Sequence, residues 1–204
     1  MSVQKTVLQL ITSYSSESDA NKLWEEIEKA YTDKHRHYHN LSHLESLLIQ
    51  LDQVKTKIEE WDTVLFTLFY HDIVYNPLAN DNEEQSAIIA EKRMRALRIP
   101  LNTIENCRAQ ILATKSHQVS ASADTNYFTD ADLSILGADW EQYQQYARNV
   151  RQEYAIYPDL VYNPGRKNVL THFLQMDRLY KTPYFYTKLE ERARLNLKQE
   201  LELY

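Results

Sequence analysis

Four of the seven histidines in this 204-residue chain fall within one short segment, Lys34–His43. His39 and His43 are four positions apart, so they share one face if a helix extends back to His39. Neutral imidazoles in that arrangement can bind one metal ion together. The zinc-protease pattern does not apply, because Asn40 stands where that pattern needs a glutamate base. A polar, partly exposed cluster without a metal is the alternative.

A second candidate pair, His71 and Asp72, interrupts the apolar segment Thr63–Tyr75. Burying an adjacent imidazole and carboxylate without partners is costly. A metal cation would satisfy both groups, whereas a purely structural pairing would need a matching arginine or lysine and a further donor. On residue types alone, both explanations stay open.

Taken in order, these residues and a distant aspartate resemble the HD superfamily of metal-dependent phosphohydrolases. That pattern is an early histidine, a later His-Asp pair and a distant aspartate. The chain offers R-x-x-H-N at 36–40, Y-H-D at 70–72 and D-A-D-L at 130–133. It is similar in particular to a small group of stand-alone predicted HD phosphohydrolases, through the segments RHYHNLSH, FYHDIVYNP, DNEEQSA, ATKSH, FTDADLSILG and ERARLNLKQEL between about 36 and 201.

The resemblance implies an irregular helical bundle and a divalent metal ion held by four residues, His39, His71, Asp72 and Asp132. His43 is expected to be an alternative ligand or to support the ligands from behind. Asp132 precedes a leucine as the last aspartate of the pattern does, and is preferred to Asp130, which is expected to cap a short helix. Nitrogen and oxygen ligands accept Mn, Co, Ni, Mg, Fe or Zn, so the identity of the metal is open.

The expected activity is hydrolysis of a small phosphoester, a nucleotide or related phosphomonoester, by water whose pKa the metal lowers from about 15.7 toward ~7. The candidate catalytic residues are Asp72, Glu84 and His117. Other residues are candidate contacts to the substrate or to the ligands: Arg36, Glu83, Lys115 and Arg166. The helix dipole also explains acidic residues at 83 and 84, and a solvated loop histidine or surface cations need no function. A module that keeps the metal site, binds a nucleotide or partner and turns nothing over is the rival interpretation.

Helices must position these residues, because apolar positions recur at helical spacing almost throughout and no segment alternates with period two. We predict an all-α fold. One helix is expected to start at about 40–42. Further helices are expected over 63–75, 82–98, 102–114, 167–180 and 183–203. The segments 116–126 and 159–166 read as loops. A short helix after Thr129 is expected to end at Gly137 in a left-handed cap.

Composition narrows the function classes. One domain, 1–204, is expected, with a motif core at about 36–137 and C-terminal helices over 139–203. Only two glycines occur, which excludes a glycine-rich phosphate loop. A formal charge of −6 argues against a nucleic-acid polymer as partner.

The sequence also predicts a soluble cytoplasmic protein without membrane contact. It has a single cysteine, Cys107, and it lacks a signal sequence and a long apolar run. Assembly into a homo-oligomer is left open.

Overall fold

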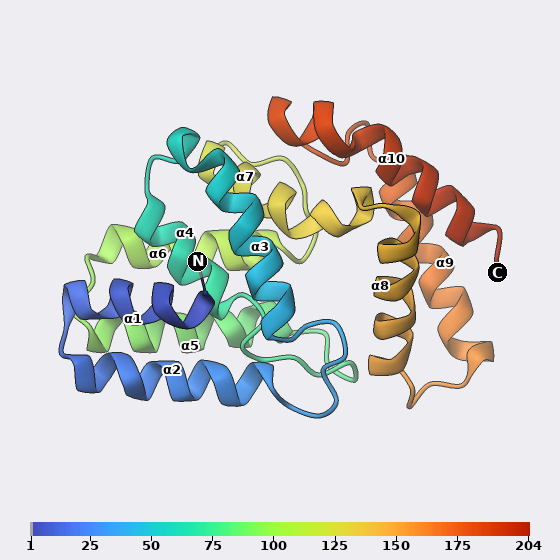
Figure 1. Cartoon of the computed structure of the whole chain (residues 1–204). Coiled ribbons are helices and arrows are strands. Elements are labelled where there is room, and N and C mark those ends of the chain that lie inside the picture. The colour runs from blue at the N-terminus through green and yellow to red at the C-terminus, as the bar shows by residue number, and fades with distance from the viewer. Residues whose placement is uncertain (1) are drawn as a thin grey trace.

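The computed structural model describes residues 2–204, and over that range it is helical with no strand. Its elements in chain order are α1 (Val3–Tyr14), α2 (Glu17–Tyr31), α3 (Leu41–Val54), η1 (Lys55–Lys57), α4 (Trp61–Tyr70), α5 (Asn82–Ala96), α6 (Leu101–Ala113), α7 (Ala123–Asp132), η2 (Leu133–Gly137), α8 (Trp140–Glu153), α9 (Asp159–Gln175) and α10 (Pro183–Leu201). Here η1 and η2 are 3-10 segments. The prediction of a single all-α domain is confirmed (Figure 1).

Helix α4 is the centre of the N-terminal part of the fold. It contacts α1, α3, α5, α6 and α7, and every residue from Thr63 to Tyr70 is buried. Each large apolar side chain so buried contributes roughly 1.5–3 kcal/mol to folding. This explains why the sequence is apolar on all sides. The helix ends at Tyr70, so His71 and Asp72 lie where the chain leaves the core.

The three C-terminal helices form a group beside the N-terminal helices (Figure 1). Helix α10 packs along η2 and α9, and α8 contacts η2. A buried ion pair joins two of these helices: Arg166 on α9 donates two hydrogen bonds, of 2.7 and 2.8 Å, to Glu200 on α10. Tyr143 on α8 donates a hydrogen bond to the same carboxylate, so one charged group connects all three helices.

The predicted loop at 116–126 is helical from Ala123 onward, and the predicted loop at 159–166 is helical throughout, which corrects those two predictions. Helix α7 begins at Ala123, because the Ser122 side chain accepts a hydrogen bond from the backbone N–H of Thr125. Helix α9 begins at Asp159 and contains Pro164. The carbonyl that Pro164 leaves without a donor lies four residues earlier in an exposed turn, where water can solvate it.

Gly137 does not adopt the left-handed conformation that the sequence suggested. Its role is close packing: a Cβ added there would lie 2.7 Å from Cβ of Leu189 on α10. The glycine therefore lets η2 approach α10.

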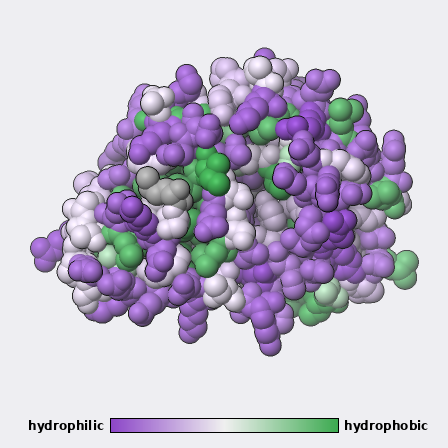
Figure 2. Space-filling model, in the orientation of Figure 1, coloured by the Kyte–Doolittle hydropathy of each residue, from purple (hydrophilic) through white to green (hydrophobic). Residues whose placement is uncertain are grey.

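The surface facing the viewer in Figure 2 is mostly hydrophilic, and its apolar side chains are scattered in small groups. None of the helices within residues 2–204 is long and apolar enough to cross a bilayer.

Candidate metal site

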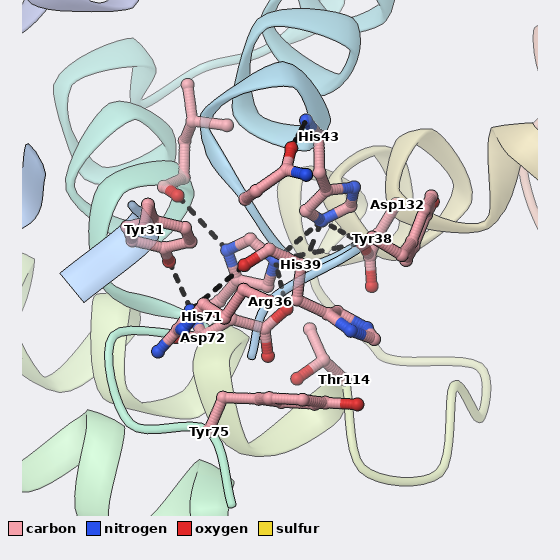
Figure 3. Close-up of polar contacts among 12 residues, drawn as sticks. Tyr31, Arg36, Tyr38, His39, His43, His71, Asp72, Tyr75, Thr114 and Asp132 are labelled. Atoms are coloured by element: carbon pink, nitrogen blue, oxygen red, sulfur yellow. Dashed lines mark hydrogen bonds and ion pairs between the residues drawn. The ribbon is translucent and has the colours of Figure 1, made fainter. Parts of the chain in front are cut away.

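Three helix ends bring His43, His71 and Asp132 together (Figure 3). His43 lies in the first turn of α3, His71 follows α4 directly, and Asp132 is the last residue of α7. The Nε2 atoms of His43 and His71 are 3.2 Å apart, and Asp132 Oδ1 lies 3.4 and 3.7 Å from them. One donor atom from each residue falls within 4.8 Å of the others, so this largely buried group could hold a metal ion.

Asp72 borders the same group. Its Oδ2 is 3.2 Å from His71 Nε2 and 3.9 Å from His43 Nε2. The predicted ligands His71, Asp72 and Asp132 therefore lie together, although Asp132 is distant in the sequence from the adjacent pair.

The carboxylates of the site stay ionised, and their charge favours the protonated form of His71. Burial opposes charge on His71, but the charge of Asp72, the hydrogen bond that His71 donates to Asp72 and the charge of Asp132 outweigh that effect and raise the pKa of His71 to about 9. Burial likewise opposes ionisation of Asp132, yet the hydrogen bond to His43 and the charge of His71 lower the pKa of Asp132 to about 2. The pKa of Asp72 is also well below its usual range, despite burial, because of His71.

The orientation of His71 suits a ligand. Its Nδ1 is 3.0 Å from the carbonyl oxygen of Leu68, to which it donates a hydrogen bond. Such a bond fixes the ring and, once the second proton leaves, the tautomer that directs the Nε2 lone pair at the site. Two imidazoles and two carboxylates form a donor set that divalent cations accept.

His39, the first ligand in the sequence-based prediction, lies outside the group of His43, His71 and Asp132. Helix α3 begins at Leu41 with Asn40 as its N-cap, so His39 precedes the helix, although its ring lies beside that of His43 with centroids 5.8 Å apart. Its Nδ1 is 2.7 Å from Glu153 Oε2, and its ring stacks on Tyr75 with centroids 4.3 Å apart. The structure thus places His43, the alternative of the sequence analysis, among the donor atoms.

Glu153 is the residue that the sequence analysis missed. Its carboxylate, which is fully buried, accepts hydrogen bonds from the backbone N–H groups of Tyr38 and His39 and from the Tyr75 hydroxyl, and it pairs with the His39 ring. One signal was available in the sequence: Glu153 stands three positions after Val150, which places the two on the same face of a helix.

His117 lies on the other side of Asp132 from the two imidazoles. Its Nε2 is 3.7 Å from Asp132 Oδ2, whereas His43 and His71 face Oδ1. Burial, assisted by the charge of Lys181 and opposed by Asp132, lowers the pKa of His117 to about 4, so the ring is neutral. Its backbone φ is 51°, an uncommon conformation for a side chain of this size. Its Nδ1 is buried and lacks a hydrogen-bond partner among residues 2–204.

Two other predicted residues have structural positions near the site. Arg36 donates hydrogen bonds to the backbone carbonyls of His39, Asp72 and Ile73, and so ties the His39 loop to the segment after α4. Asp130 does not cap its own helix, which corrects that prediction. It is buried and accepts hydrogen bonds from the backbone N–H groups of Lys181 and Thr182, immediately before α10, because its side chain points toward that segment.

The remaining predicted residues are already paired with one another or with structural partners. Lys115 Nζ is 2.6 Å from Glu84 Oε1 and 3.8 Å from Glu83 Oε2. Arg166 is bound to Glu200, as described above. Of the two glutamates, Glu83 lines a cavity with Asp72 and His117.

Comparison with known proteins adds nothing to this geometry: no family model, no curated protein and no solved structure matches the chain. The HD resemblance therefore stays a prediction.

Proposed function

We propose that this protein is a metal-dependent hydrolase of small phosphoesters, with an HD-type site. The observation that carries the proposal is the convergence of the Nε2 atoms of His43 and His71 with a carboxylate oxygen of Asp132 at the ends of three helices. These donors fit a divalent cation in kind and number, with Asp72 adjacent. When bound, such a cation supplies Lewis acidity that acidifies water and polarises a phosphoryl oxygen.

The residues around the donors support hydrolysis by holding charge and protons. Asp72 and Asp132 are ionised and offset the charge of a cation. His117 is neutral and buried at Asp132, so its ring can accept a hydrogen bond from water in the cavity at neutral pH and orient that water. Arg36 fixes the backbone on both sides of the site. Glu83 faces the same cavity and is a second candidate for moving protons.

A binding module without turnover is the second candidate function, and one observation favours it. The two cations expected to contact phosphate, Lys115 and Arg166, are each already paired with a glutamate. A catalyst of phosphoryl transfer usually directs free cationic groups at the transferring group.

The test has two steps. Purified protein dialysed against Mn²⁺, Co²⁺, Ni²⁺ or Mg²⁺ should retain metal by elemental analysis, and it should then cleave members of a phosphoester panel. Replacement of His117 by alanine should lower turnover by roughly 10² to 10⁴ with metal content unchanged, the range for losing a general acid or base. Glu83→Gln should lower turnover more than the matched change Glu84→Gln, because only Glu83 lines the cavity. Metal retention without cleavage of any ester would favour the binding module, and loss of metal on dialysis would refute the site.

A further inference from the structure

Asp132 lines two cavities, each with a volume of about 510 Å³. We call them the tyrosine cavity, which also contacts His39, Asp72 and His117, and the polar cavity, which also contacts His43. We propose that the substrate is a phosphodiester whose phosphorus lies beside Asp132, with one organic arm in each cavity. This inference rests on the proposed hydrolase function and narrows its substrate class.

The wall of the tyrosine cavity suits a planar ring. Five tyrosines line it: Tyr75, Tyr146, Tyr154, Tyr157 and Tyr162. Aromatic faces bind planar groups by stacking, and their hydroxyls add hydrogen bonds at the edges. The Tyr162 hydroxyl is buried and lacks a hydrogen-bond partner among residues 2–204, as does Nδ1 of His117. A ring that carries donors and acceptors would satisfy such groups.

The polar cavity suits a group rich in hydroxyls. Ser42, Ser46 and Gln50 are four residues apart on one face of α3, and Ser134, Gln142 and Asn149 line it as well. Gln50 Oε1 is buried and has no partner within residues 2–204, so it is an acceptor that a ligand hydroxyl could satisfy. The charged residues Asp139, Lys188 and Arg192 also line this cavity, whereas tyrosines dominate the other, and this difference in side-chain type predicts two unlike arms.

Among the described residues, Asp132 is the one that lines both cavities, so a phosphate beside it can direct one arm into each. The Tyr38 ring lines the polar cavity and contacts Tyr146, which lines the tyrosine cavity. A monoester has one organic group and would leave one cavity without ligand contacts. Each cavity lies within the range of about 300–1,000 Å³ typical of small-molecule sites.

The reaction consumes one water and balances without another reactant. The oxygen of water forms a bond to phosphorus, and the bond between phosphorus and the oxygen of one arm breaks. One proton of the water stays on the product phosphate, and the other ends on the departing oxygen. A diester anion therefore gives a monoester anion and an alcohol.

Steady-state kinetics of the metal-loaded protein test the proposal with three chromogenic esters: p-nitrophenyl phosphate, bis(p-nitrophenyl) phosphate and thymidine 5′-(p-nitrophenyl phosphate). We expect both diesters to be cleaved with higher kcat/KM than the monoester. Ser46→Trp fills the polar cavity and Val161→Trp fills the mouth of the tyrosine cavity. Their matched controls are the neighbouring exposed positions, Glu45→Trp and Leu160→Trp, which line neither cavity.

Each filling variant should lower kcat/KM for the diesters by about tenfold or more, equivalent to ~1.4 kcal/mol, and each control should leave it unchanged. The monoester has one arm, so at least one filling variant should spare it. Calorimetric titration of the EDTA-treated protein with the thymidine diester gives a readout without turnover, and the filling variants should weaken binding by a similar factor.

The failures of the two proposals are distinguishable. Cleavage of the monoester at least as efficient as that of the diesters, or filling variants that match their controls, would overturn the diester inference and leave the hydrolase proposal standing. Absence of diester binding by the parent protein would also overturn it. If no ester is cleaved with any metal, the hydrolase proposal fails, and the inference fails with it.

Discussion

Replacement of Glu153 by glutamine should destabilise the protein far more than the same substitution at an exposed position. The Glu153 carboxylate, which is fully buried, accepts four hydrogen bonds, of 2.7, 2.9, 2.7 and 2.8 Å, from two backbone N–H groups, the His39 ring and the Tyr75 hydroxyl. Glutamine keeps one oxygen for the two backbone donors. Its amide nitrogen cannot accept from His39 or Tyr75, so two charge-assisted bonds are lost in a buried site.

Breaking a buried ion pair costs about 3–5 kcal/mol of stability. Because the variant keeps the hydrogen bonds from the two backbone N–H groups, we expect the free energy of unfolding to fall by ~3 kcal/mol. For a chain of this length, 1 kcal/mol corresponds to about 2–4 °C, which gives a fall in Tm of roughly 6–12 °C. Thermal unfolding followed by circular dichroism at pH 7 measures the change. The exposed residue Glu141 on the same helix supplies the control, Glu141→Gln, which should lie within about 1 °C of the parent. A Glu153→Gln variant as stable as that control would refute the role of the buried carboxylate.

Three further outcomes follow from the same structure. Burial opposes charge on both members of the His39–Glu153 pair, but the bond between them raises the pKa of His39 and lowers that of Glu153. The stabilisation from ionised Glu153 is therefore present above its ordinary pKa of 4.5 and is lost as pH falls through the lowered pKa of the folded state. The stabilisation from protonated His39 is present below its ordinary pKa of 6.5 and is lost as pH rises through the raised pKa of the folded state. The Tm difference between parent and Glu153→Gln should thus be largest between about pH 5 and 6 and shrink on either side, and a difference independent of pH would contradict the pairing. Elemental analysis should show that His43→Ala loses metal whereas His39→Ala retains it, and the reverse would restore the sequence-based ligand. Gly137→Ala should cost about 1–3 kcal/mol in chemical denaturation because of Leu189, while Gly165→Ala, with open space around it, should be neutral or mildly stabilising; equal stabilities would contradict the close packing of η2 on α10.

The sequence was sufficient for the fold class because helical spacing and glycine content do not depend on tertiary contacts. The central apolar helix followed from the same pattern. Two expectations failed for different reasons. Helix α9 tolerates Pro164 because the carbonyl that loses its donor lies in an exposed turn. Gly137 allows close packing against Leu189 and does not form a left-handed cap, and that tertiary contact joins residues far apart in the sequence.

The candidate site was predictable in part. His71, Asp72 and Asp132 could be named from residue types and order, and the structure places them together. The choice between His39 and His43 depended on where α3 begins, and Asn40 decides that by accepting hydrogen bonds from the N–H groups of the first turn. Glu153 pairs with a histidine 114 positions away in the sequence, a contact that spacing cannot reveal.

Anomalous diffraction from a crystal grown with Mn²⁺ is the most direct test of the central claim. The account predicts one strong peak within bonding distance of Nε2 of His43, Nε2 of His71 and a carboxylate oxygen of Asp132. A peak coordinated by His39 instead of His43, or a fully ordered cluster without a peak at saturating Mn²⁺, would contradict it.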